Sequence, residues 1–132
     1  MSPFLGLAPM LMTRDLPRTI EFYTTILGFK IDGKWPDDKP CWCSMTNGFV
    51  RLMFQTPEMY REKEPKLTGR LYIYTDDVMA IYDAIKERVK VIEGPEVYFY
   101  KMKEIAIEDC NGYVLTFGQD TDEPPTCNES PD

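Results

Sequence analysis

The sequence predicts an α+β fold made of two βαβββ modules, each a strand and a helix followed by three more strands. Two observations lead to this prediction. A strand, an acidic cap and a short amphipathic helix occur twice, with the caps Asp15 and Asp77 lying 62 residues apart. In each copy the last two strands meet at an Asn-Gly pair, at 47–48 and 111–112, which is a strong hairpin signal. The 132 residues are therefore expected to form one domain of two similar halves.

The first module is predicted over about residues 5–55. Its opening strand, at about 6–12, leads into a helix that Asp15 caps and that ends at Gly28, a residue suited to a left-handed stop. Three strands are expected to follow, at 29–34, 41–46 and 49–55.

The second module, at about 69–119, repeats this order after a charged, proline-bounded linker at 56–68. Its elements are expected as a strand at 69–75, a helix at 77–88 and strands near 89–93, 103–108 and 113–118. The segment 97–101 either extends a strand or forms an aromatic loop. Together the two modules define a single domain over 1–119.

Residues 120–132 are expected to be an acidic, disordered tail. Five acidic residues and three prolines lie within the last fourteen residues, 119–132, and such a composition cannot bury enough apolar surface to order itself.

The overall composition restricts the possible partners. A net charge of −7 disfavours nucleic acids, which are bound by neutralising phosphates, and favours cationic ligands at long range. The longest apolar runs are too short to span a membrane, and the N-terminus lacks the basic and apolar parts of a signal peptide. Four cysteines without a secretory signal predict reduced thiols and a cytoplasmic location. Cys41 and Cys43 are too close along one strand for an ordinary disulfide.

Alternation along the predicted strands separates two faces of the sheet. In the strand at 69–75, Leu71 and Ile73 are expected to pack on the helix, whereas Arg70, Tyr72 and Tyr74 point the other way. The same alternation places these residues on the face opposite the helix: Ala8, Met10, Met12, Arg51, Met53, Gln55, Val114, Thr116 and Gly118. Because neither face is strongly charged, we expect a ligand or a partner to cover the face that lacks a helix.

Two segments resemble the vicinal oxygen chelate superfamily, the group of glyoxalases, bleomycin resistance proteins and extradiol dioxygenases. The first is RDLPRTIEFYTTILGFK at 14–30, and the second is EIAIEDCNGYVLTFGQ at 104–119, in which Cys110 replaces the usual proline. The resemblance covers about residues 5–119. It implies paired βαβββ modules that form a cup-shaped mixed sheet, in a protein that is usually a homodimer.

Members of this superfamily that use a metal ion hold it with two histidines and two glutamates in the cup. Carried over by motif spacing, these positions fall at Ala8, Arg70, Thr116 and either Arg51 or Met53. None of these residues is a good metal ligand, and the sequence contains no histidine at all. The resemblance therefore implies no metal and no cofactor. We find no catalytic residues to assign.

The cup is instead predicted to bind a small molecule through aromatic and thioether side chains, which suit flat heteroaromatic ligands. The candidate ligand-binding residues are Met10, Trp35, Trp42, Arg51, Met53, Arg70, Tyr72, Tyr74, Tyr98, Tyr100 and Thr116. Arg51 and Arg70 have two possible roles. They bind an anionic ligand group, or Arg70 forms an internal ion pair with Glu104 or Glu108.

These features favour a metal-independent, dimeric binding protein similar to the bleomycin resistance branch. Such a protein sequesters a flat antibiotic or metabolite in a groove between the two subunits of the dimer, and the acidic net charge favours a cationic ligand. One alternative is a lyase, isomerase or dioxygenase-type enzyme with a non-standard site, such as Glu104, Glu108 or Tyr72. Another is an interaction module whose cup is filled by its own dimer partner.

Overall fold

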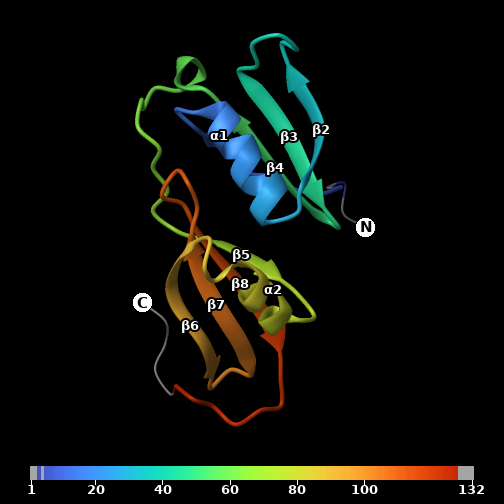
Figure 1. Ribbon diagram of the computed structural model, residues 1–132, viewed down its shortest axis with the longest axis vertical. Coiled ribbons are helices and arrows are strands. Elements are labelled where there is room, and N and C mark those ends of the chain that lie inside the picture. Colours follow the sequence, from blue (N-terminus) through green and yellow to red (C-terminus); the bar gives the residue numbers. More distant parts are fainter. Residues whose placement is uncertain (1–2, 4, 128–132) are drawn as a thin grey trace. The chain divides into compact units, whose positions relative to one another are not determined.

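The computed structural model describes residue 3 and residues 5–127, and Figure 1 shows its ribbon. The chain forms two compact units, Met1–Lys66 and Leu67–Asp132, which we call the first and second modules. The boundary between them lies inside the predicted linker. Each module has its own mixed four-stranded sheet and one α-helix. The predicted α+β class and the two βαβββ modules are therefore confirmed.

The first module contains a sheet in the order β1-β4-β3-β2, in which β1 runs parallel to β4 and the other neighbours are antiparallel. Its elements are β1 (Met10–Met12), α1 (Leu16–Glu21), a π-helical turn (Phe22–Ile26), β2 (Lys30–Trp35), β3 (Trp42–Asn47), β4 (Val50–Gln55) and a short 3₁₀ helix (Pro57–Met59). The last of these lies within the predicted linker.

Local chemistry explains both ends of the first helix. The Asp15 carboxylate accepts a hydrogen bond of 3.0 Å from the Arg18 backbone N–H, as an N-cap does. At the other end Gly28 adopts a φ of +73°, which supports the predicted stop. The predicted single helix is nevertheless interrupted, because its last turn is π-helical.

The first strand is shorter than predicted. It pairs with β4 only from Met10 onward, although the apolar sequence begins earlier. Pro9, just before the strand, has no backbone N–H with which to extend the ladder of hydrogen bonds. Its carbonyl accepts a hydrogen bond of 2.9 Å from the Met53 N–H. Leu5 and Leu7 consequently remain exposed.

The core of the first module lies between α1, its π-helical turn and the sheet. The fully buried Tyr23 ring packs against Phe29 and Phe54, with ring centroids 5.5 and 5.1 Å away. Cys43 of β3 is also fully buried, and burial raises the pKa of its thiol to about 11. Trp42, the residue before Cys43 on this strand, remains partly exposed.

The second module repeats the topology, with a sheet in the order β5-β8-β7-β6 and β5 parallel to β8. Its elements are β5 (Leu71–Tyr74), α2 (Val78–Ile85), β6 (Lys90–Tyr98), β7 (Met102–Glu108) and β8 (Val114–Asp120). Strand β6 is much longer than predicted, since its pairing with β7 shifts register around Gly94 and continues to Tyr98. The segment 97–101 therefore ends the strand and then turns.

Part of the predicted disordered tail has a defined place. The backbone N–H groups of Thr126 and Cys127 donate to the Val97 carbonyl at 2.8 and 3.0 Å, which places this segment against β6. The rest of the tail, 128–132, lies outside the described residues.

Helix α2 packs on β7 and β8, and among the described residues of the second module no helix covers the other side of this sheet. We call this side the helix-free face. The α2 N-terminus is joined to β8 by a 2.8 Å hydrogen bond from the Val78 N–H to the Gln119 side chain. Neither described α-helix has the length and apolar character needed to cross a bilayer.

Candidate functional site

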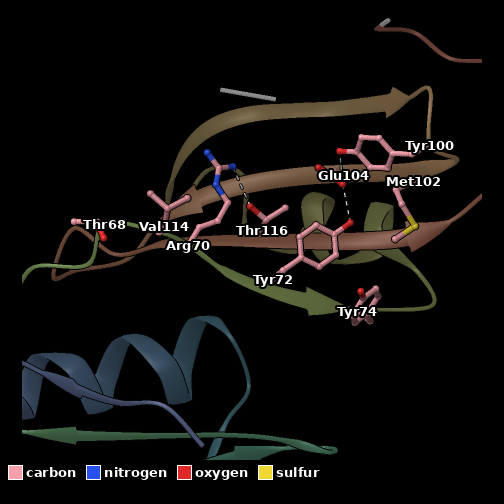
Figure 2. A pocket seen from close by; sticks show the side chains of 10 residues that line it. Thr68, Arg70, Tyr72, Tyr74, Tyr100, Met102, Glu104, Val114 and Thr116 are labelled. Carbon is pink, nitrogen blue, oxygen red and sulfur yellow. Dashed lines mark hydrogen bonds between the residues drawn. The ribbon is translucent and has the colours of Figure 1, made fainter. Parts of the chain in front are cut away.

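A cavity of about 690 Å³ lies on the helix-free face of the second module (Figure 2). We call it the second-module cavity. Its lining residues come from the segment before β5 and from β5, β7, β8 and the β6–β7 turn. They are Thr68, Gly69, Arg70, Tyr72, Tyr74, Tyr100, Met102, Glu104, Val114 and Thr116.

Strand alternation places the first part of this lining. Arg70, Tyr72 and Tyr74 are spaced two residues apart and all line the cavity. On the neighbouring strand β8, Thr116 is the register partner of Tyr72. The predicted division of the β5 segment into two faces is thus confirmed. Five of the predicted ligand-binding residues share this cavity: Arg70, Tyr72, Tyr74, Tyr100 and Thr116.

A buried carboxylate joins two tyrosines at one end of the cavity (Figure 2). The hydroxyl groups of Tyr72 and Tyr100 donate to the same oxygen of Glu104, Oε2, at 2.7 and 2.9 Å. Glu104 is only 3% exposed. Tyr72 reaches it from β5, two strands away, because Gly118 on the intervening β8 leaves room for its ring.

Burial and this carboxylate both favour the neutral form of the two tyrosines. Burial, and next the hydrogen bond to Glu104, raise the pKa of Tyr72 and of Tyr100 well above the usual range for tyrosine. Tyr98, whose ring stacks on Tyr100 at a centroid distance of 5.6 Å, has its pKa raised to about 12, mainly by burial. All three hydroxyls are therefore hydrogen-bond donors at neutral pH.

The close fit of Tyr72 over Gly118 gives a testable prediction. A Cβ atom at position 118 would lie 2.6 Å from Cζ of Tyr72, so Gly118→Ala should displace the ring and break its hydrogen bond to Glu104. We expect the free energy of unfolding to fall by about 1–2 kcal/mol. In a Tyr72→Ala background the same change should have an effect within about 0.5 kcal/mol of zero, measured by urea denaturation. An equal loss in both backgrounds would contradict this packing.

At the other end of the cavity, polar groups that include Thr116 and Glu93 hold Arg70. Its Nη1 donates to Thr116 Oγ1 at 3.1 Å, and its Nη2 lies 3.4 Å from a Glu93 carboxylate oxygen. The predicted ion pair with Glu104 or Glu108 is wrong. Glu108 lies opposite Lys90 in the β6–β7 register and pairs with it at 3.1 Å, while Glu104 accepts from the tyrosines.

The residues at the metal-ligand positions of the resembled superfamily do not fit a divalent cation. Arg70 and Thr116 are hydrogen-bonded to each other, and a guanidinium at this position repels a dication. No group of three or more histidine, cysteine, aspartate or glutamate side chains in the described residues is arranged to hold a metal ion.

The remaining predicted site residues do not line this cavity. Tyr98 is buried behind Tyr100 at 4% exposure. The other five belong to the first module, where Met10 pairs with Met53 and Trp35 with Trp42 across adjacent strands, and Arg51 lies 3.9 Å from Asp32. A role for these residues in ligand binding stays a prediction.

The structure adds five lining residues that the sequence-based list lacks: Thr68, Gly69, Met102, Glu104 and Val114. Alternation on β8 already places Val114 on the same face as Thr116. Alternation on β7 could have placed Met102 beside Glu104. Gly69 is predicted to begin the strand at 69–75, but β5 starts only at Leu71, and Thr68 is the last residue of the predicted linker.

Comparison with protein families gives one match over most of the chain. The family model described as the Glyoxalase/Bleomycin resistance protein/Dioxygenase superfamily matches residues 7–117. A comparison with curated proteins gave no match.

Solved structures with similar folds include three that cover nearly the whole chain. A virulence protein from Salmonella typhimurium has a TM-score of 0.71 at 20% identity, covering 92% of this chain and 100% of its own. A glyoxalase/bleomycin resistance protein/dioxygenase from Nocardioides has a TM-score of 0.72 at 16% identity, with coverages of 98% and 92%. The bleomycin-binding protein of Streptomyces verticillus, complexed with copper(II)-bleomycin, has a TM-score of 0.67 at 21% identity, with coverages of 93% and 100%.

Proposed function

Because this chain belongs to the glyoxalase, bleomycin resistance protein and dioxygenase superfamily, we propose that it binds a small, flat molecule non-covalently in the second-module cavity. The superfamily membership that the sequence motifs predict is confirmed by the family match. The proposal is that the protein acts by sequestration, without a metal ion and without altering its ligand.

One observation carries this proposal. The cavity combines three tyrosine rings and a methionine with the hydrogen-bonded pair Arg70 and Thr116. These two residues occupy two of the positions from which metal-using members of the superfamily hold their ion. Tyrosine and methionine side chains bind flat rings by stacking and dispersion, whereas a Lewis acid would need oxygen or nitrogen ligands in place of Arg70.

Bleomycin, metal-free and copper-loaded, is the first probe, since a fold neighbour is complexed with copper(II)-bleomycin. We expect saturable heat in titration calorimetry and a raised melting temperature for at least one form. Replacing Tyr100 by alanine should weaken this binding by about tenfold or more. Tyr82→Ala removes a tyrosine from α2, outside the cavity lining, and is the matched control.

These experiments test the choice of bleomycin as the ligand and the choice of the second-module cavity as the binding site separately. If bleomycin gives neither heat nor a shift in melting temperature, it is excluded as the ligand. A thermal-shift screen of metabolites and antibiotics then supplies other ligands for the same test. A ligand that binds Tyr100→Ala as tightly as it binds the unmodified protein would contradict the second-module cavity as its site.

We also propose that the protein is a cytoplasmic homodimer. Exposed apolar side chains such as Leu7 and Trp35 in the first module favour burial against another surface. Light scattering coupled to size exclusion should give about twice the 15.4 kDa mass of one chain. A mass of one chain across a wide concentration range would contradict the dimer.

The second candidate is a lyase or isomerase with a non-standard site, and the observation that favours it is Glu104. A buried carboxylate beside a cavity and two hydroxyl donors has the position that a general base needs. Mass spectrometry of a bound ligand after incubation with the protein distinguishes the two candidates, because only an enzyme alters its ligand. Elemental analysis of protein purified without chelator tests separately for a metal ion. A stoichiometric transition metal would contradict the metal-independent binding function.

A further inference from the structure

The second-module cavity contains a negative charge that no basic side chain of the described protein balances. Glu104 lines the cavity and is 3% exposed, yet its carboxylate forms no ion pair with a lysine or arginine among the described residues. Its hydrogen-bond donors are the two neutral hydroxyls of Tyr72 and Tyr100. Burying a carboxylate costs free energy when no cationic partner is present. A ligand cation beside Glu104 would offset part of this cost and so bind more tightly.

Arg70 does not balance this charge. Its guanidinium is engaged by Thr116 and Glu93 at the opposite end of the lining, as Figure 2 shows for Thr116. Glu93 offsets the charge of Arg70, which leaves Glu104 as the excess charge of the site. The two ends of the cavity therefore differ, with a neutral ion pair at one end and a carboxylate at the other.

Aromatic rings surround the acidic end. The rings of Tyr72 and Tyr74 meet edge to face at a centroid distance of 5.1 Å, and Tyr100 lies on the other side of Glu104 (Figure 2). The π-faces of tyrosine rings attract cations within about 6 Å, most strongly when the cation is partly desolvated. A carboxylate among three tyrosines is thus complementary to an ammonium or amidinium group.

We propose that Glu104, with Tyr72, Tyr74 and Tyr100, binds a positively charged nitrogen group carried by the flat ligand. This inference rests on the proposed function and specifies its ligand class as an aromatic cation. The aromatic part of the ligand occupies the cavity between the two ends, and its charged group lies at the Glu104 end.

The test uses three probes that share one ring system and differ in charge: 1-naphthylmethylamine, 1-naphthylmethanol and 1-naphthylacetate. At neutral pH and low salt the amine should bind at least about tenfold more tightly than the alcohol, and the acetate more weakly than the alcohol. Titration calorimetry or thermal shift measures all three.

Glu104→Gln keeps the size and an acceptor oxygen but removes the charge. It should lower the affinity for the amine about tenfold or more and leave the affinity for the alcohol within about twofold. Glu108→Gln is the matched control, because it changes the same charge on the same strand outside the cavity lining and should leave the preference for the amine intact. Circular dichroism and melting temperature verify that both variants are folded.

Tyr74→Leu supplies a second variant at an exposed position where folding is not at risk. It should weaken amine binding about threefold to tenfold through loss of one ring. Equal binding of amine and alcohol by the unmodified protein, or an unchanged preference in folded Glu104→Gln, would overturn the inference alone. Failure of all three probes to bind would contradict the proposed function, and the inference with it.

Discussion

Gly94→Ala is expected to lower the free energy of unfolding by about 3–4 kcal/mol, which is exceptional for the addition of one methyl group. Gly94 has a φ of +82°, a region that disfavours alanine, and it lies at the register shift of β6. A Cβ atom there would overlap the Glu104 carbonyl oxygen and approach Cα of Ile105 to 3.1 Å. These neighbours are backbone atoms of a central strand, so they cannot rotate away. Urea denaturation followed by circular dichroism measures the loss.

Two other glycines separate the causes of this effect. Gly48 has a φ of +60° but nothing within 4 Å of a Cβ, so Gly48→Ala measures the cost of the left-handed conformation, about 1 kcal/mol. Gly69 has open space and no such φ, and Gly69→Ala should be nearly neutral. If Gly94→Ala were no more destabilising than Gly48→Ala, the close approach of β6 to β7 would be refuted.

Phe54→Ala is expected to destabilise the protein by about 3–5 kcal/mol. Phe54 lies on β4 with no exposed surface, and its ring packs against the buried Tyr23 at a centroid distance of 5.1 Å. Alanine would leave a cavity between the helix and the sheet that the close-packed core cannot fill by small movements. Chemical denaturation of the purified variant gives the magnitude.

Phe49→Ala provides the control for this prediction in the same module. Phe49 follows Gly48 in the β3–β4 hairpin and is fully exposed, so its truncation should change stability by less than about 0.5 kcal/mol. A comparable loss for both phenylalanines would contradict the described core.

Local patterns were sufficient to predict the order of the elements and the faces of the strands. Caps such as Asp15 and Asp77, and turns at Gly48 and Gly112, act through contacts within a few residues, and the structure contains all four. Alternation along β5 correctly separated Tyr72 from Ile73, because successive side chains of any strand point to opposite faces. Strand ends were less predictable, since pairing depends on a distant partner.

The polar partners of the site were decided only by the tertiary structure. Tyr72 and Glu104 are separated by 32 residues, and their hydrogen bond depends on strand order and on the space above Gly118. Arg70 pairs with Glu93 and not with the glutamates that alternation suggested. Periodicity fixes the face on which a side chain lies. The choice among several carboxylates on that face depends on register shifts, neighbouring rings and competing donors, and these are properties of the assembled sheet.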